Sequence, residues 1–505
     1  MFTLKEIFLY AEDAPLIFSQ YLFLFLFSFG FVLYWIFYKK LAVRNVYLLL
    51  FSLFFYYKSG GLYFGLLLLS TVVDYWCGME IHKSKKEVNR KAFLVLSLVV
   101  NLGLLAFFKY SAYIVSLINY YVGTDLVPVN FMAVLSNNIF GSDFSIYDIF
   151  LPVGISFYTF QTLSYTIDIY RRQIESAKNI IDFGFFVTFF PQLVAGPIVR
   201  AADFIPQIYK KFSLTREQLG VALYLIMTGL FKKMVISDYI SVNFVDRVFD
   251  DPNLYSGFSN LMAVYGYSIQ IYCDFSGYSD MAIGLAALLG FQLPLNFNSP
   301  YKATSITDFW RRWHISLSTW LRDYLYISLG GNRKGKIRTY INLMITMLLG
   351  GLWHGAATKF IIWGGLHGAA LALHKLWIRY VPKINSIPPI VSKIFAGLIT
   401  FHFVAFCWIY FRADSVDKVK LMLSRIGTDF QWSGIGERLT QYTTPLLLIL
   451  LGFAIHFIPT NVKSKAKEVF VIIPDFAKVL VCAVIIFICY QAKTADVQPF
   501  IYFQF

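Results

Sequence analysis

The chain has 505 residues, of which 58% are hydrophobic and only 14% are charged. A soluble protein carries about a quarter of its residues as Asp, Glu, Lys and Arg, so this composition excludes a soluble globular domain. The formal net charge of +15 is typical of basic cytoplasmic loops between membrane spans, and we do not interpret it as a nucleic-acid-binding surface.

Apolar stretches long enough to cross a bilayer, which takes about 20 residues, recur along the chain. They lie near 16–38, 46–76, 92–108, 149–169, 180–196, 217–236, 259–290, 338–353, 359–377, 394–411, 443–459 and 469–490. The second and the seventh are long enough to be helical hairpins, turning at Gly60-Gly61 and Ser276-Gly277. We therefore predict an all-α polytopic membrane protein with about 11 transmembrane helices plus re-entrant and amphipathic helices.

The distribution of charge indicates how the chain is oriented. Basic loops at 39–44, 83–91 and 463–467 are expected in the cytoplasm, whereas the stretch between Lys109 and Arg171, which has no Lys or Arg, is expected outside. Alternation from these anchors places both ends of the chain outside. Lys232 and Lys233 do not fit this assignment, because strict alternation of the spans would place these two basic residues on the extracytoplasmic side.

No linker interrupts the pattern, so one membrane domain is expected over 1–505, and its longest polar interruption includes 302–338. Apolar side chains recur there at three- and four-residue steps among basic ones, which predicts an amphipathic helix at the cytoplasmic face. The turn Gly330-Gly331-Asn332 ends it. Its basic residues either meet lipid phosphate or bind an anionic donor such as coenzyme A, or an acidic carrier protein. The candidate donor-binding residues are Trp310, Arg311, Arg312, Trp313, Arg322 and, further along, Trp353.

Two of the seven histidines, His314 and His354, lie in DFWRRWHISLSTWLRDY and GGLWHGA, beside an almost entirely apolar segment. An imidazole is costly inside hydrocarbon, so its presence there predicts a function. The small residues around His354 either let two backbones approach closely or leave room for a substrate.

The remaining histidines and the five cysteines predict no metal site. His82 adjoins a run of lysines and is expected to be solvated, whereas His402 and His456 are expected to make interhelical hydrogen bonds. His367 and His374 share a helix face, but haem held between helices needs facing pairs, and the other apolar segments offer single histidines. The cysteines show no paired spacing.

Several long motifs together resemble the membrane-bound O-acyltransferase (MBOAT) family. They are DFWRRWHISLSTWLRDYLYISLGGNRKG, GGLWHGA, WGGLHG, FFPQLVAGPIVR at 189–200 and IYCDFSGYSDMAIGLAALLGFQLPLNFNSPY at 271–301. The likeness is to the bacterial branch that acts in alginate and peptidoglycan O-acetylation and in teichoic acid D-alanylation. It implies a helical bundle around a central funnel or tunnel, with His354 catalytic and His314 nearby.

Acyl transfer from a thioester to a hydroxyl needs a base and a group that stabilises the oxyanion. We assign His354 as the base and expect His314 to orient the reacting groups. FIYFQF at 500–505 resembles a FIYxxF motif whose tyrosine carries the acyl group, which implies an acyl-Tyr502 intermediate in an extracytoplasmic tail over 491–505. The alternative is an aromatic tail anchored at the membrane interface.

Together these features predict a multi-pass O-acyltransferase of the bacterial inner (cytoplasmic) membrane, surrounded by lipid. We expect it to pass acetyl groups from acetyl-CoA, or from an acyl carrier protein, to a cell-surface polysaccharide through an extracytoplasmic SGNH-type transferase, without a bound cofactor or nucleic acid. The alternatives are D-alanyl transfer to teichoic acid, a polysaccharide transporter or flippase, and a haem-binding electron carrier. The residues do not identify the glycan.

Overall fold

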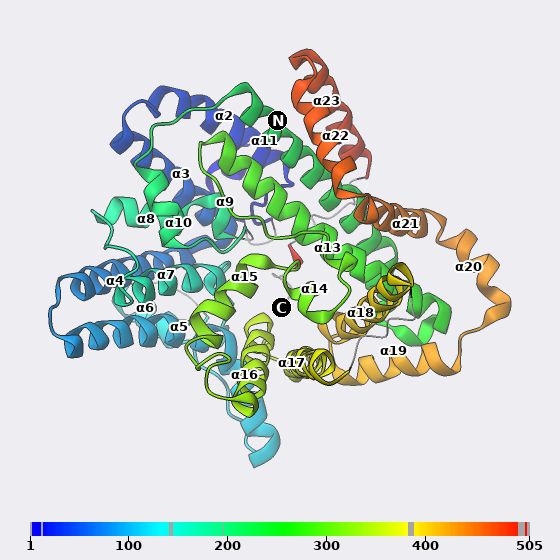
Figure 1. Ribbon diagram of the computed structural model, residues 1–505. Helices are drawn as coiled ribbons and strands as arrows, with labels where there is room; N and C mark the ends of the chain where they lie inside the picture. The colour runs from blue at the N-terminus through cyan, green and yellow to red at the C-terminus, as the bar shows by residue number, and fades with distance from the viewer. Residues whose placement is uncertain are drawn as a thin grey trace.

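The computed structural model describes residues 3–11, 14–140, 145–194, 196–381, 388–492 and 500–501. Every element in this part of the chain is helical, which confirms the predicted all-α class. Figure 1 shows α13 crossing the middle of the molecule, with helices from the first and last thirds of the chain on either side of it.

The elements, in chain order, are α1 (Leu4–Phe8), α2 (Tyr21–Phe37), α3 (Leu41–Gly60), η1 (Gly61–Tyr63), α4 (Phe64–Lys83), α5 (Glu87–Val122), α6 (Phe131–Phe140), α7 (Ile155–Tyr170), α8 (Ile180–Thr188), α9 (Phe190–Leu193), α10 (Ala201–Ile208), α11 (Arg216–Leu230), η2 (Phe231–Asp238), η3 (Ser241–Val245), α12 (Asp246–Asp250), η4 (Pro252–Leu254), α13 (Gly257–Leu288), η5 (Pro300–Lys302), α14 (Ile306–Trp310), α15 (Ile315–Trp320), η6 (Leu321–Tyr326), α16 (Lys336–His354), α17 (Thr358–Tyr380), α18 (Pro389–Arg412), α19 (Val416–Thr428), η7 (Trp432–Gly434), α20 (Ile435–Gln441), α21 (Thr443–Phe457), α22 (Thr460–Ile472) and α23 (Asp475–Ala492). The elements η2, η3 and η6 are π-helical, and the other η elements are 3₁₀ turns.

Five helical runs in the described residues are long and apolar enough to cross a membrane, or six if a pair bent by 89° is counted as one span. They are Leu41–Lys83, Glu87–Val122, Arg216–Asp250, Pro389–Arg412 and Asp475–Ala492, and the bent pair is Trp432–Gln441 with Thr443–Phe457. This finding confirms a polytopic protein but not the predicted count of about 11. Some predicted spans form shorter or divided helices, as α8 and α9 do.

The predicted break at Gly60-Gly61 is present, whereas the one at Ser276-Gly277 is not. The helix α3 ends at Gly60, Gly61 has a φ of 61°, and a 3₁₀ turn separates α3 from α4 within one helical run of 43 residues. The helix α13 continues unbroken through Ser276-Gly277 for 32 residues, which is about 48 Å at 1.5 Å per residue. A Cβ on Gly277 would lie 2.7 Å from the carbonyl oxygen of Gly229 in α11. Gly277 therefore permits close helix packing and does not mark a turn.

Ion pairs between α13 and η2 explain why Lys232 and Lys233 did not fit the alternation of loops. Lys232 and Lys233 lie inside the run Arg216–Asp250, not in a loop. Lys232 pairs with Asp280 of α13, and Lys233 pairs with Asp274 of α13 at 2.5 Å. Lys233 is buried, Lys232 is half-buried, and both are ion-pair partners within the bundle, so they do not belong in a count of loop charges.

The segment 302–338 differs from the single amphipathic helix that was predicted. It divides into α14, α15 and η6, and the break includes His314, whose φ of 43° is left-handed. Residues 296–298 supply backbone hydrogen-bond partners at this break. Asn298 N–H donates to the Arg312 carbonyl and Ile315 N–H donates to the Asn296 carbonyl, both at 2.9 Å. The predicted turn is confirmed, since Gly330 and Gly331 both have positive φ. The expected apolar side chains are buried: Trp313, Leu317, Trp320, Leu321 and Tyr324.

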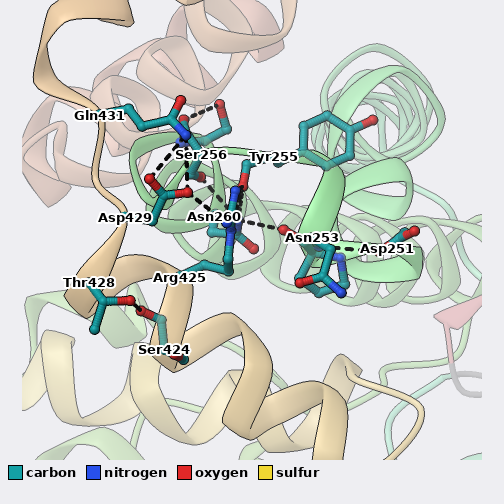
Figure 2. Close-up of polar contacts among 12 residues, drawn as sticks. Asp251, Asn253, Tyr255, Ser256, Asn260, Ser424, Arg425, Thr428, Asp429 and Gln431 are labelled. Atoms are coloured by element: carbon teal, nitrogen blue, oxygen red, sulfur yellow. Dashed lines mark hydrogen bonds and ion pairs between the residues drawn. The ribbon is translucent and has the colours of Figure 1, made fainter.

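The N-terminal end of α13 is fixed by a polar cluster that also holds α19 (Figure 2). The side chain of Ser256 caps the helix, and the amide of Asn260 donates to three carbonyls, those of Pro252, Tyr255 and Ser256. Arg425 of α19 donates twice to the Tyr255 carbonyl, at 3.0 and 3.2 Å. These bonds satisfy groups that the helix itself leaves open.

We predict that Gly277→Ala destabilises the protein by about 1–3 kcal/mol, because the new methyl group overlaps the α11 backbone. Gly103→Ala in α5 is the matched control, since a Cβ there meets no atom within 4 Å. The midpoint temperature of unfolding in mild detergent should fall for Gly277→Ala only. Equal midpoints for the two variants would contradict the close contact between α11 and α13.

Candidate active site

His354 is the last residue of α16, and the extended backbone of Gly355 ends the helix there. The glycines around it serve close packing: a Cβ on Gly351 would overlap the Phe360 carbonyl, and one on Gly364 would overlap the Met347 carbonyl. The helices α16 and α17 therefore meet backbone to backbone. Of the two roles considered for the small residues, close approach is the one the structure supports for these positions.

A cavity of about 100 Å³ borders His354. Its wall consists of Lys109, Leu151, Pro152, Val153, Gly154, Ile155, Ser156, Phe157, Trp353 and His354. A water molecule needs about 10–15 Å³ measured in this way, so the cavity has room for several waters or for a small acyl group. The imidazole is therefore not enclosed on every side by packed helices.

Lys109 of α5 holds the end of α16. Its ammonium group donates to the carbonyl oxygens of Trp353 at 2.5 Å and of His354 at 3.2 Å, and the neighbouring Tyr110 hydroxyl donates to the Leu352 carbonyl at 2.8 Å. The last carbonyls of a helix lack intrahelical donors, and a cation is favourable at this end of the helix dipole. Sequence reasoning did not select Lys109. The signal was a single lysine within an apolar helix.

Aromatic rings surround the His354 imidazole. The ring centroids of Trp353 and Trp363 lie 5.0 Å from it, and that of Phe411 lies 5.1 Å away. Electrostatic interactions are stronger in such a low-dielectric setting than in water. Charges and hydrogen bonds beside this imidazole are therefore screened less than they would be at the surface.

His314 is the N-cap of α15 and is completely buried. Its Nδ1 lies 3.1 Å from Oδ1 of Asn296. Ser316 Oγ donates to the same oxygen at 2.9 Å, and the Asn296 amide nitrogen donates to Ser279 Oγ at 3.2 Å. Because an amide oxygen only accepts, Nδ1 of His314 carries the proton and the lone pair lies on Nε2. Sequence reasoning did not identify Asn296, which orients the ring.

The structure brings the two histidines to either side of Trp353. The Trp353 ring centroid lies 5.0 Å from that of His354 and 6.1 Å from that of His314. Phe157 of α7 completes the wall, 5.5 Å from Trp353 and 6.5 Å from His314. The expectation from the sequence that His314 is near His354 agrees with this arrangement.

The candidate donor-binding residues fall into two groups. Trp313 packs in the core between Phe309 at 5.7 Å and Trp408 at 4.9 Å, and Trp310 contacts Trp363 at 5.7 Å. The second group consists of arginines nearer the surface: Arg311 and Arg322 are exposed and Arg312 is half-buried.

Two arginines that sequence reasoning missed join Arg322 around Asp323. Arg200 pairs with the Asp323 carboxylate at 2.7 Å, and Arg171 donates to its backbone carbonyl at 3.3 Å. Burial alone would raise the pKa of Asp323, but the hydrogen bonds from Arg322 and Arg200 outweigh it, so that pKa lies below its ordinary value. The cluster brings two guanidinium groups to the Asp323 carboxylate and a third to its backbone carbonyl, and an anionic ligand would be attracted to it.

The other histidines agree with their predicted surroundings. His82 is exposed, His402 Nε2 lies 3.1 Å from the Tyr265 hydroxyl, and His456 Nε2 accepts the Tyr301 N–H at 3.1 Å. Within the described ranges, no group of three or more His, Cys, Asp or Glu side chains is placed to hold a metal ion.

Tyr502 lies outside the described residues, but the two residues before it are described. Phe500 and Ile501 are 0% and 3% exposed, and the Phe500 ring lies 5.2 Å from Phe275 of α13. Phe275 in turn contacts His314, with 4.6 Å between ring centroids. In Figure 1 the short red segment at the middle of the molecule is this part of the chain.

We predict that Lys109→Met lowers the turnover number for acyl transfer about 10- to 100-fold, because the end of α16 loses hydrogen bonds from a charged group. Lys58→Met is the matched control: Lys58 is also buried and donates to backbone carbonyls, those of Glu6 and Leu9, away from the cavity. Initial rates per amount of folded protein distinguish the two variants. Equal rates would show that Lys109 does not position His354.

Comparison with known proteins identifies the chain's relatives. The model of the MBOAT, membrane-bound O-acyltransferase family, matches residues 61–412, which include both His314 and His354. The peptidoglycan O-acetyltransferase of Helicobacter pylori is 39% identical over 443 residues, covering 82% of this chain and 80% of its own. The probable alginate O-acetylase AlgI of Azotobacter vinelandii is 40% identical, covering 86% of this chain and 83% of its own.

A more distant relative has a different named activity. The teichoic acid D-alanyltransferase of Bacillus subtilis is 31% identical over 268 residues, covering 50% of this chain and 67% of its own. The family match over more than half of the chain, together with these relatives, establishes what kind of enzyme it is. The chain belongs to the membrane-bound O-acyltransferase family.

Proposed function

We propose that this O-acyltransferase moves acetyl groups from acetyl-CoA in the cytoplasm to a cell-surface polysaccharide, across the bacterial inner membrane. The cavity beside His354 is the observation that carries the proposal, because it places open space for a small reacting group next to a residue with a buried imidazole. The Helicobacter pylori and Azotobacter vinelandii relatives, each matching more than four-fifths of this chain, are named for O-acetylation of glycans, which supports acetyl as the group transferred.

The proposed chemistry has two transfers. In the first, the Tyr502 hydroxyl attacks the thioester carbonyl while His354 takes its proton; a C–O bond forms, the C–S bond breaks and the thiolate leaves with a proton. In the second, which an extracytoplasmic SGNH-type partner catalyses, a hydroxyl of the polysaccharide attacks the acetyl-tyrosine; a new C–O ester bond forms, the bond to the phenol oxygen breaks, and the phenol is released with a proton. A phenol, with a pKa of about 10, is a better leaving group than an alkyl alcohol. Transfer of the acetyl group from the tyrosine ester to an alkyl hydroxyl is therefore favourable in free energy.

Two groups of residues have supporting roles in this proposal. His314, fixed by Asn296, orients the reacting groups through its Nε2 lone pair. Arg311, Arg312 and Arg322 form the donor side, where guanidinium groups suit the phosphates of coenzyme A. Trp353 lines the cavity, and Trp310 and Trp313 support this region by packing beneath it.

Transfer of D-alanine to teichoic acid is the second candidate, and the Bacillus subtilis relative favours it. That relative matches only half of this chain, whereas the acetylating relatives match most of it. Supplying the purified enzyme with acetyl and D-alanyl donors separately distinguishes the two activities.

We predict that His354→Ala abolishes O-acetylation of the cell-surface polysaccharide and leaves its export unchanged, because the base is lost while the helices remain. The control is His402→Ala, which removes an exposed imidazole on α18 that bonds Tyr265 on α13. Acetyl ester content and total polysaccharide are measured on the same cells. Full acetylation with failed export in His354→Ala would instead indicate a polysaccharide transporter.

We predict that Tyr502→Phe likewise abolishes acetylation of the glycan, since phenylalanine cannot form an ester. Tyr490→Phe is the control, because Tyr490 is an exposed tyrosine near the end of α23. With labelled acetyl-CoA, mass spectrometry should find the acetyl group on the peptide that contains Tyr502. Normal acetylation by Tyr502→Phe would rule out the tyrosine intermediate.

A further inference from the structure

A buried acidic group lies midway along α13, where the helix is surrounded by apolar side chains. The Asp274 side chain is 3% exposed and lies 2.5 Å from Lys233, which is 1% exposed and also pairs with Asp238 at 2.7 Å. Two carboxyl groups thus share one ammonium group. A buried carboxylate is tolerated only when its oxygens are bonded, so Asp274 requires a further donor.

That donor comes from the segment 500–501. Oδ1 of Asp274 accepts from Lys233, and Oδ2 accepts the backbone N–H of Ile501 at 3.0 Å. The two residues are 227 positions apart in the sequence. A hydrogen bond to a charged acceptor is stronger than one to a neutral acceptor. The donor here is a backbone N–H, so the bond does not depend on the identity of the side chain at position 501.

The side chain before this bond occupies an aromatic site on the same helix. The Phe500 ring lies 5.2 Å from Phe275 and 5.1 Å from Tyr278, and no part of it is exposed. Tyr278 is itself fixed by Phe18, whose ring stacks on it at 4.6 Å. The rings of Phe275 and Tyr278, together with the Asp274 carboxylate that accepts a backbone N–H, form a binding site, here called the seat. It suits an extended segment that begins with an aromatic residue.

The seat adjoins the candidate active site, because Phe275 contacts Phe500 and also contacts His314, at 4.6 Å between ring centroids. A tail anchored at the membrane interface would instead keep its aromatic rings at the surface of the bundle. Complete burial of Phe500 therefore argues for a specific docking site within the protein.

We propose that α13 carries a docking site for the segment 500–505, with Asp274 as its anchor and Lys233 as the residue that fixes Asp274. Asp274 is a positioning residue: it holds the backbone at Ile501, the residue that directly precedes Tyr502 in the sequence. The purpose of docking rests on the proposed function, whereas the docking itself does not.

The test is hydrogen–deuterium exchange of the full chain in lipid nanodiscs, read on the peptide that contains Ile501. Asp274→Asn keeps the shape but removes the charge, and we expect exchange at the Ile501 amide to rise about tenfold or more. Asp280→Asn is the matched control, since it removes the carboxylate of the other α11–η2 to α13 ion pair, with Lys232. Equal exchange in wild type, Asp274→Asn and Asp280→Asn overturns the proposal.

A second pair of variants leaves the ion pairs intact, in case Asp274→Asn fails to fold. Ile501→Pro removes the N–H that Asp274 accepts, and Ile501→Val keeps it. Ile501 lies beyond α23, so neither change interrupts that helix. Protease cleavage after the segment's aromatic residues should accelerate about tenfold in Ile501→Pro and stay at the wild-type rate in Ile501→Val. Equal cleavage of the two variants overturns the anchor.

Tyr502→Phe separates this inference from the proposed function. It should abolish acetylation and leave exchange at Ile501 at the wild-type level, because the anchor does not involve the phenol. Normal acetylation with intact protection disproves the tyrosine intermediate and supports docking. Abolished acetylation with lost protection in Tyr502→Phe disproves docking through Asp274.

Discussion

The pairing of α13 with the run α11–η2 is the constraint on which the centre of this molecule depends. Charged side chains in an apolar interior are stable only when paired, and removing one partner of such a pair costs about 3–5 kcal/mol. Lys233 is paired in this way with Asp274, and the contact between Gly229 and Gly277 brings the two backbones close enough for the pair to form. Since α13 cannot shift without breaking these contacts, it is a rigid reference for everything attached to it.

Each of the two histidines is held by a different helix. His314 is oriented through Asn296, which bonds Ser279 of α13, whereas His354 is held through its backbone by Lys109 of α5. The two meet at Trp353, so the site is assembled from helices that are distant in the sequence. Placement by packed helices limits the drift of catalytic groups more strongly than placement by loops, and errors of about 1 Å are costly to the rate.

The sequence predicted the helical class and that His314 lies near His354, because composition and long motifs can be recognised without knowledge of the fold. The predicted turn at Gly277 was wrong. A glycine in a sequence can indicate either a turn or a close helix contact, and only the position of Gly229 in the structure shows that Gly277 serves the contact. The break before α15 could not be foreseen because residues 296–298 supply its hydrogen bonds. For the same reason Asn296 and Lys109 were missed: each acts through a partner that the local pattern does not contain.

The docking of Phe500 and Ile501 also bears on how an acyl carrier could serve two sides of a membrane. A hydrogen bond to a charged group contributes about 1.5–3 kcal/mol, and burial of a phenylalanine about 1.5–3 kcal/mol. Leaving the seat therefore costs about 3–6 kcal/mol, which corresponds to roughly one molecule in a hundred to one in ten thousand being undocked at any time. In the proposed scheme, docking of this strength favours the docked position while still releasing the segment often enough for delivery. An anchor stronger by several kcal/mol would release the segment too rarely, and a much weaker one would leave it undocked most of the time.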